Sequence, residues 1–103
     1  MEYKKSFFGR TIIDSSDAEE VEEIDEIELE YYKTHNLAER NERKYGIEIV
    51  KILKNEKFNI ESKIVNNISN EEKEISRLLE ILMLNKVTPV TVEDVISDIS
   101  VLD

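Results

Sequence analysis

Three consecutive stretches of the chain distribute hydrophobic residues in the way that β-strands do. Ile27, Leu29 and Tyr31 alternate with glutamates, which is the period-two pattern of a strand with one buried face. Residues 46–53 are rich in β-branched side chains, and residues 58–64 alternate again after a polar stretch typical of a hairpin loop. The pattern therefore predicts three successive antiparallel strands.

The next segment carries the strongest helical signal in the sequence. Ser69 and Glu72 have the spacing of a capping box, so we expect a helix to begin at Asn70. Asn85 is the expected left-handed residue after its last turn. The apolar residues form a wide arc at the helical period: Ile75, Leu78, Leu79, Ile81, Leu82, Met83 and Leu84. An arc this wide indicates contact with the sheet and also with a second helix or another chain, so a homodimer is a reasonable hypothesis.

A second and shorter helix is predicted after Pro89. Thr91 is the expected N-cap, with Val90 and Val95 spaced as a hydrophobic staple across it. The apolar stripe of this helix consists of Val92, Val95, Ile96, Ile99 and Leu102. Strands followed by helices are typical of an α+β fold in which the helices cover one sheet face, so the predicted order is β-β-β-α-α. The helices are expected to contribute Leu78, Leu79, Leu82, Val95 and Ile99 to the core.

The first 24 residues have a less regular pattern. Phe7, Phe8, Ile12 and Ile13 surround Gly9, which fits either a short strand or an arm that docks its apolar side chains. Ten of the seventeen residues at 14–30 are acidic, and their mutual repulsion favours a solvated connector over the one or two helical turns that the spacing also allows. The sequence thus predicts an arm and acidic connector over residues 1–24 and a single α+β domain over residues 25–103. The antiparallel sheet has three strands, or four if the arm forms one.

Net charge limits the classes of partner. The formal charge of the 103-residue chain is −10 and its pI is about 4.6, which argues against direct binding to nucleic acid or to anionic membranes and favours a partner protein with a basic surface. The chain has no cysteine, so disulfides and thiolate metal sites are excluded. It also has no apolar run long enough to span a bilayer, and a cytoplasmic location is expected.

The residues that usually carry catalysis are scarce and scattered. His35 is the only histidine and is expected to be an exposed, inert loop residue, because no triad or metal-ligand spacing accompanies it. The acidic run lacks the spacing and the turn glycine of an EF-hand loop. Gly9 and Gly46 are too far apart to form a nucleotide-binding loop. We therefore expect no enzymatic activity, no cofactor and no bound metal.

Three segments resemble a family of short, functionally uncharacterised proteins from spore-forming clostridia. They are LEYY at residues 29–32, YGIEIVK at residues 45–51 and LLEILMLNKVTPVTVEDVISD at residues 78–98. The resemblance implies a low-GC Firmicute source and a non-enzymatic or regulatory character. It supplies no active site that could be transferred to this chain.

These observations favour a protein-binding or regulatory module that docks through apolar surface. Its affinity would then come from Val92, from Ile96 or from the arm that carries Phe7 and Phe8. The alternative is an acidic inhibitor of a nucleic-acid-binding protein that imitates phosphate charge, in which Glu19, Glu20, Glu22 and Glu23 would contact the basic partner. An enzyme of unknown type is a third hypothesis.

Overall fold

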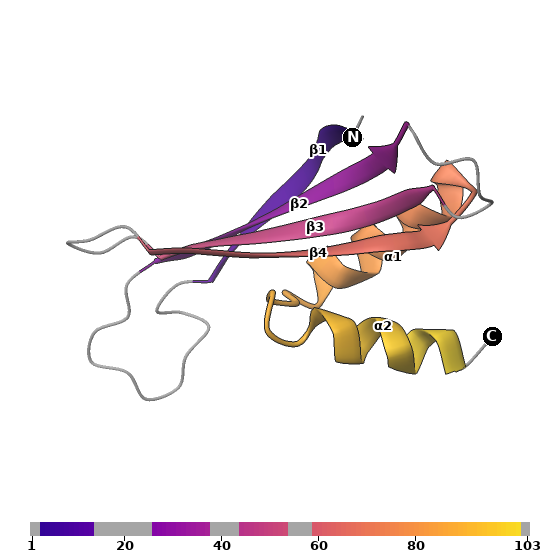
Figure 1. Ribbon diagram of the computed structural model, residues 1–103. Coiled ribbons are helices and arrows are strands. Elements are labelled where there is room, and N and C mark those ends of the chain that lie inside the picture. The colour runs from indigo at the N-terminus through magenta and orange to yellow at the C-terminus, as the bar shows by residue number, and fades with distance from the viewer. Residues whose placement is uncertain (1–2, 14–25, 38–43, 54–58, 102–103) are drawn as a thin grey trace.

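The structure is a computed structural model that describes residues 3–13, 26–37, 44–53 and 59–101. It contains one four-stranded sheet and two C-terminal helices, both on the same side of the sheet (Figure 1). The elements in chain order are β1 (Tyr3–Ile13), β2 (Ile27–Asn36), β3 (Tyr45–Leu53), β4 (Asn59–Ser69), α1 (Glu72–Leu84) and α2 (Val92–Val101). Within the described residues, no helix is long and apolar enough to cross a membrane.

The predicted α+β class is confirmed, and the sheet has the fourth strand that the sequence left open. The strand order is β1-β2-β3-β4, and every neighbouring pair is antiparallel. Strand β1 pairs with β2 from Tyr3 opposite Asn36 to Ile13 opposite Ile27, so residues 3–13 belong to the sheet and do not form a separate arm. The register shifts once, between Phe7 and Gly9, where Phe8 is the extra residue of a β-bulge.

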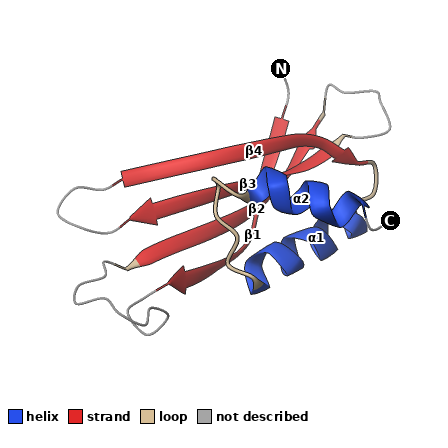
Figure 2. Cartoon of the chain, turned by 90° about the horizontal axis from the view of Figure 1, so that it is seen from below, coloured by secondary structure: helices blue, strands red, loops and turns tan. Residues whose placement is uncertain are grey.

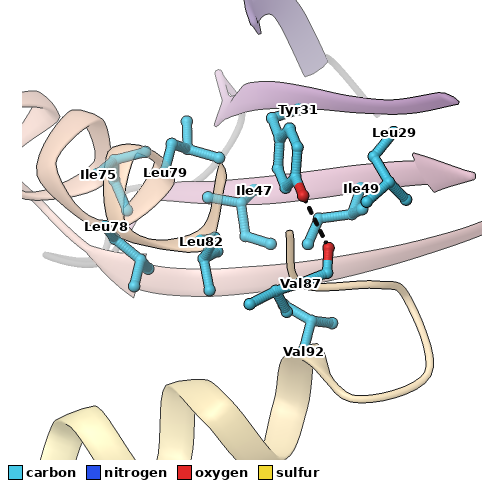
Figure 3. Close-up of a cluster of buried hydrophobic side chains, with 10 residues drawn as sticks. All are labelled: Leu29, Tyr31, Ile47, Ile49, Ile75, Leu78, Leu79, Leu82, Val87 and Val92. Carbon is cyan, nitrogen blue, oxygen red and sulfur yellow. Dashed lines mark hydrogen bonds between the residues drawn. The ribbon is translucent and has the colours of Figure 1, made fainter. Parts of the chain in front are cut away.

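Alternation in the strands decides which side chains meet the helices. Tyr31 of β2 lies directly opposite Ile49 of β3, with Leu29 and Ile47 diagonal to this pair, and all four are completely buried on the helix-covered side of the sheet. The glutamates between them project to the other side, as the period-two pattern predicts. Figure 3 shows these side chains packed against α1, whose buried residues are Ile75, Leu78, Leu79 and Leu82.

Helix α1 begins two residues later than predicted, because Ser69 is the last residue of β4 and not a helix cap. The Ser69 hydroxyl accepts the backbone N–H of Glu71 at 3.0 Å and donates to the Glu74 carboxylate. The predicted capping box is therefore wrong. Glu72 reaches β2 instead, where Lys33 Nζ lies 2.7 Å from its carboxylate, and this hydrogen bond lowers the pKa of Glu72 below its ordinary value.

Helix α1 ends in a Schellman motif whose left-handed residue is Lys86, one position after the predicted Asn85. Lys86 has a φ of 51°, and its N–H donates to Met83 O at 3.1 Å. The N–H of Val87 donates to Leu82 O at 3.0 Å, which completes the paired bonds of the motif. Both Val87 and Leu82 are buried, so the motif turns the chain back into the core directly after the helix.

Helix α2 starts directly after Thr91, as expected, and the Thr91 carbonyl accepts the N–H of Val95 at 3.1 Å. Val90 is exposed, so the predicted staple to Val95 does not form. Among the side chains of α2 that the structure describes, up to Ile99, Val92 is completely buried in the core. Val95 and Ile99, which were predicted as core, are half-buried against it.

A buried hydrogen bond joins the sheet to the corner between the helices. The Tyr31 hydroxyl donates to the Val87 carbonyl at 2.9 Å, across 56 positions of sequence (Figure 3). Tyr31 is completely buried, and this burial raises the pKa of its hydroxyl far above the ordinary value. The phenol therefore stays neutral and remains a donor throughout the physiological pH range.

We expect Tyr31→Phe to reduce the free energy of unfolding by about 1–3 kcal/mol, because it leaves the buried Val87 carbonyl without its donor. Tyr32→Phe is the matched control on the same strand, since the Tyr32 hydroxyl bonds to a half-buried Glu30 carboxylate. Urea denaturation of both variants measures the difference. Equal losses for the two variants would contradict the structural importance of the Tyr31 bond.

Gly46 is a second position where the fold restricts the sequence. A Cβ added there would collide with the Val65 carbonyl oxygen and would lie 2.9 Å from Thr34 Oγ1. A Cβ at Gly9 would lie 2.7 Å from the flexible Met83 thioether, which can move away. We expect Gly46→Ala to destabilise the protein by about 1–3 kcal/mol and Gly9→Ala by clearly less. Thermal melts that rank Gly9→Ala as the more damaging variant would show that the sheet is packed differently.

Candidate functional site

The side of the sheet opposite the helices is covered by no described element, and we call it the open face (Figure 1). The strand register places its side chains in three rungs that run from β1 across to β4. The first is Phe7, Tyr32, Glu48 and Ile64; the second is Arg10, Glu30, Val50 and Ser62; the third is Ile12, Glu28, Ile52 and Ile60. Each outer rung therefore has an apolar residue at both ends and a carboxylate within it.

Large apolar side chains occupy the four corners of the open face. Phe7 and Ile12 on β1 and Ile60 and Ile64 on β4 are between 37% and 65% exposed. Single exposed hydrophobic residues are ordinary, but several that share one face mark a surface suited to contact with another molecule. Val50 and Ile52, both half-buried, continue the apolar surface between β4 and the middle of the sheet.

The centre of the open face is acidic. Glu28 and Glu48 are only 5% and 7% exposed, because neighbouring side chains surround them. Arg10 lies 3.7 Å from the Glu28 carboxylate, and Lys5 lies 3.1 Å from that of Glu48. With Glu30, the group has three carboxylates and two cations, which leaves a formal charge of −1 on this part of the surface.

Tyr32 connects the apolar and acidic parts of the open face. Its ring meets Phe7 edge to face at a centroid distance of 5.6 Å, and Lys5 Nζ lies 4.5 Å from the ring centroid. The Tyr32 hydroxyl donates to Glu30 at 2.9 Å. Burial raises the pKa of Tyr32, and the bonded Glu30 carboxylate raises it further because it disfavours a second negative charge. Tyr32 thus contacts an apolar, a cationic and an acidic side chain of the open face at once.

The structure separates the residues that the sequence proposed for partner binding. Phe7 lies on the open face, whereas Phe8 is half-buried on the other side against the core. Val92 is completely buried, so it belongs to the core and offers no contact surface. Ile96 is half-buried between the helices. The four acidic candidates, Glu19, Glu20, Glu22 and Glu23, lie outside the described residues.

Ile96 lines a hollow of about 540 Å³ between α1, α2 and the end of β4. Its apolar lining includes Ile68, Leu78, Ile81 and Ile99, and charged residues of α1 form its rim. The two helices leave this space because α2 approaches the core mainly through Val92 at its first turn.

The sequence predicted His35 to be an exposed loop residue, and that position is wrong. His35 is half-buried in β2 and stacks on Tyr45 of β3 at a centroid distance of 4.4 Å. In the described part of the chain, no group of three or more histidine, cysteine or acidic side chains is arranged to hold a metal ion.

Sequence reasoning missed most of the open face. The alternation of β2 predicts that Glu28 and Glu30 project away from the core, but it cannot show which residues of β1, β3 and β4 stand beside them. That information depends on the register of the sheet and on the bulge at Phe8. The alternation over residues 58–64 puts Ile60 and Ile64 on one side of a strand, but it does not show that this side is the one away from the helices.

One family model matches this chain, a family of unknown function (DUF6514), over residues 10–101. No curated protein and no solved structure matches it. The matched range extends from within β1 to the end of α2 and so includes both the sheet and the helices. This confirms the resemblance to a functionally uncharacterised family, while the clostridial source stays a prediction. Since the match covers most of the sequence, the chain belongs to the DUF6514 family.

Proposed function

We propose that this protein is a small, non-catalytic, cytoplasmic binding module whose open face docks onto an apolar surface of another protein that carries arginine or lysine. The observation that supports the proposal is the arrangement of four exposed apolar corners around an acidic centre. Burial of apolar area is the main favourable term in most protein association, at roughly 25 cal/mol per Å² removed from water. The corners supply that term, and the centre supplies specificity.

A basic partner fits the charge of this surface. The open face has a local formal charge of −1 and belongs to a chain of net charge −10, so a cationic protein is attracted over a distance and its encounter rate rises. An incoming guanidinium can share Glu28 or Glu48 with their present cations, because the Arg10 and Lys5 side chains are well exposed. Two copies placed face to face would instead oppose their carboxylates.

Paired substitutions test the proposal. Phe7→Ser combined with Ile60→Ser removes two corners of the open face, and Leu84→Ser is the matched control because Leu84 is 74% exposed at the end of α1 on the other side of the sheet. A partner is first identified by affinity capture and mass spectrometry, and its dissociation constant is then measured by calorimetry. We expect the double variant to bind at least tenfold more weakly, since two apolar contacts that each contribute about 1 kcal/mol together exceed the roughly 1.4 kcal/mol of a tenfold change.

The same partner distinguishes the alternatives. Unchanged affinity in the double variant, together with loss of binding when Glu19, Glu20, Glu22 and Glu23 are changed to glutamine, would favour the phosphate-mimicking inhibitor. Loss of binding in Leu84→Ser alone would place the contact on the helices. Circular dichroism of each variant shows that the fold is retained.

A further inference from the structure

Strand β4 forms one edge of the sheet and has a long regular section. Among the described residues it pairs only with β3, and the pairing runs without a shift from Leu53 opposite Asn59 to Ile47 opposite Val65. Five of these seven β4 residues are exposed and the other two are half-buried. An edge strand with these properties presents a row of backbone N–H and C=O groups on which another strand can pair.

We propose that β4 pairs with β4 of a second copy of the chain, antiparallel, with Ser62 opposite Ser62. In this register Glu61 of each copy lies opposite Lys63 of the other, and Ile60 lies opposite Ile64. Opposite charges and apolar pairs directly across an antiparallel ladder each stabilise it. The dimer goes beyond the proposed binding function and does not depend on it.

The neighbouring registers are unfavourable. In an antiparallel pair of identical strands, the two residue numbers of each pair add to a constant. Side chains stay on their own face only if this sum changes in steps of two, which moves the centre of the pairing by one residue. One such step places Glu61 opposite Glu61, and the opposite step places Lys63 opposite Lys63. Like charges directly opposite each other destabilise a ladder. The charge pattern of β4 therefore selects the register centred on Ser62.

The contacts that Glu61 and Lys63 make within one copy do not prevent this pairing. Lys51 lies 3.8 Å from Glu61, and Glu93 lies 3.1 Å from Lys63. The Glu61 and Glu93 side chains are more than half exposed, and exposed ion pairs of this kind contribute little to stability. Each side chain can therefore be shared with, or turned toward, the second copy at small cost.

The arrangement of the layers also permits the dimer. Seen from the helix side, α2 lies over β3 and β4 and does not extend past the free edge of β4 (Figure 2). A two-fold axis perpendicular to the sheet keeps both helical layers on one side, so the two open faces join into one. The other edge, β1, is less suited because the bulge between Phe7 and Gly9 interrupts it. Pairing of β1 with β4 would be head-to-tail, so it would not give a two-fold dimer and each added copy would present a further edge.

Charge exchange tests this register. Sedimentation velocity of the wild-type chain should show a concentration-dependent dimer of the 12.1 kDa protein. Glu61→Lys alone and Lys63→Glu alone should each weaken dimerisation about tenfold or more, because each creates two like-charge pairs. An equimolar mixture of the two variants should dimerise again, since every Lys then faces a Glu, and so should the chain that carries both changes. Glu80→Lys on α1 is the charge-matched control and should leave the dimer unchanged.

Cross-linking gives an independent readout in a chain that has no cysteine. Ser62→Cys should form a disulfide-linked dimer on mild oxidation, because residues directly opposite in a ladder have Cα atoms about 4.5–5.5 Å apart, within disulfide range. Asn66→Cys on the same strand should not, since the two copies of that residue would be roughly 26 Å apart at about 3.3 Å per residue. A wild-type chain that stays at 12.1 kDa up to hundreds of micromolar, or equal cross-linking of both cysteine variants, would overturn the proposal.

Discussion

The hydrogen bond from Tyr31 to the Val87 carbonyl is the contact on which the arrangement of the layers depends. Tyr31 is in the second strand and fully buried, so its hydroxyl needs an acceptor inside the core. The acceptor is available only because Lys86 takes up a left-handed conformation and turns the chain inward after α1. The bond thus fixes the corner from which α2 starts, and it connects the end of one helix to the middle of the sheet.

Both helices lie on one side of the sheet, so within the part of the chain that the structure describes the side chains of the open face are covered only by one another. Long side chains cover one another there: Arg10 and Lys5 lie against Glu28 and Glu48, and Tyr32 lies among them. Carboxylates that are this little exposed are normally paired, as these are. The same surface keeps its apolar side chains toward the two edges. A face built in this way can remain soluble alone and still have area to bury in a complex.

The sequence predicted those features of the fold that depend on the pattern within a single strand or helix. The alternation around Leu29 and Tyr31 and the arc that includes Leu82 are properties of single elements, and both predictions are confirmed. The caps were misplaced by one or two residues because Ser69 and Asn85 can satisfy backbone groups in several geometries. Residues 3–13 were ambiguous because a bulge breaks their alternation. The open face depends on register between four strands, which no single segment encodes.

The bulge at Phe8 also has a consequence for how the chain can vary in length. Side chains along a regular strand alternate between the two sides of the sheet. The extra residue interrupts this alternation, so the side chains before it lie on the opposite side from the one that regular alternation, counted back from Ile13, would give them. Removal of one residue between Ser6 and Arg10 would therefore close the bulge and leave both halves of β1 on their present sides, whereas removal of a residue elsewhere in the strand would put some side chains on the wrong side. The bulge is thus the place where β1 can lose a single residue and keep its two faces, while loops outside the strands can change in length without this restriction.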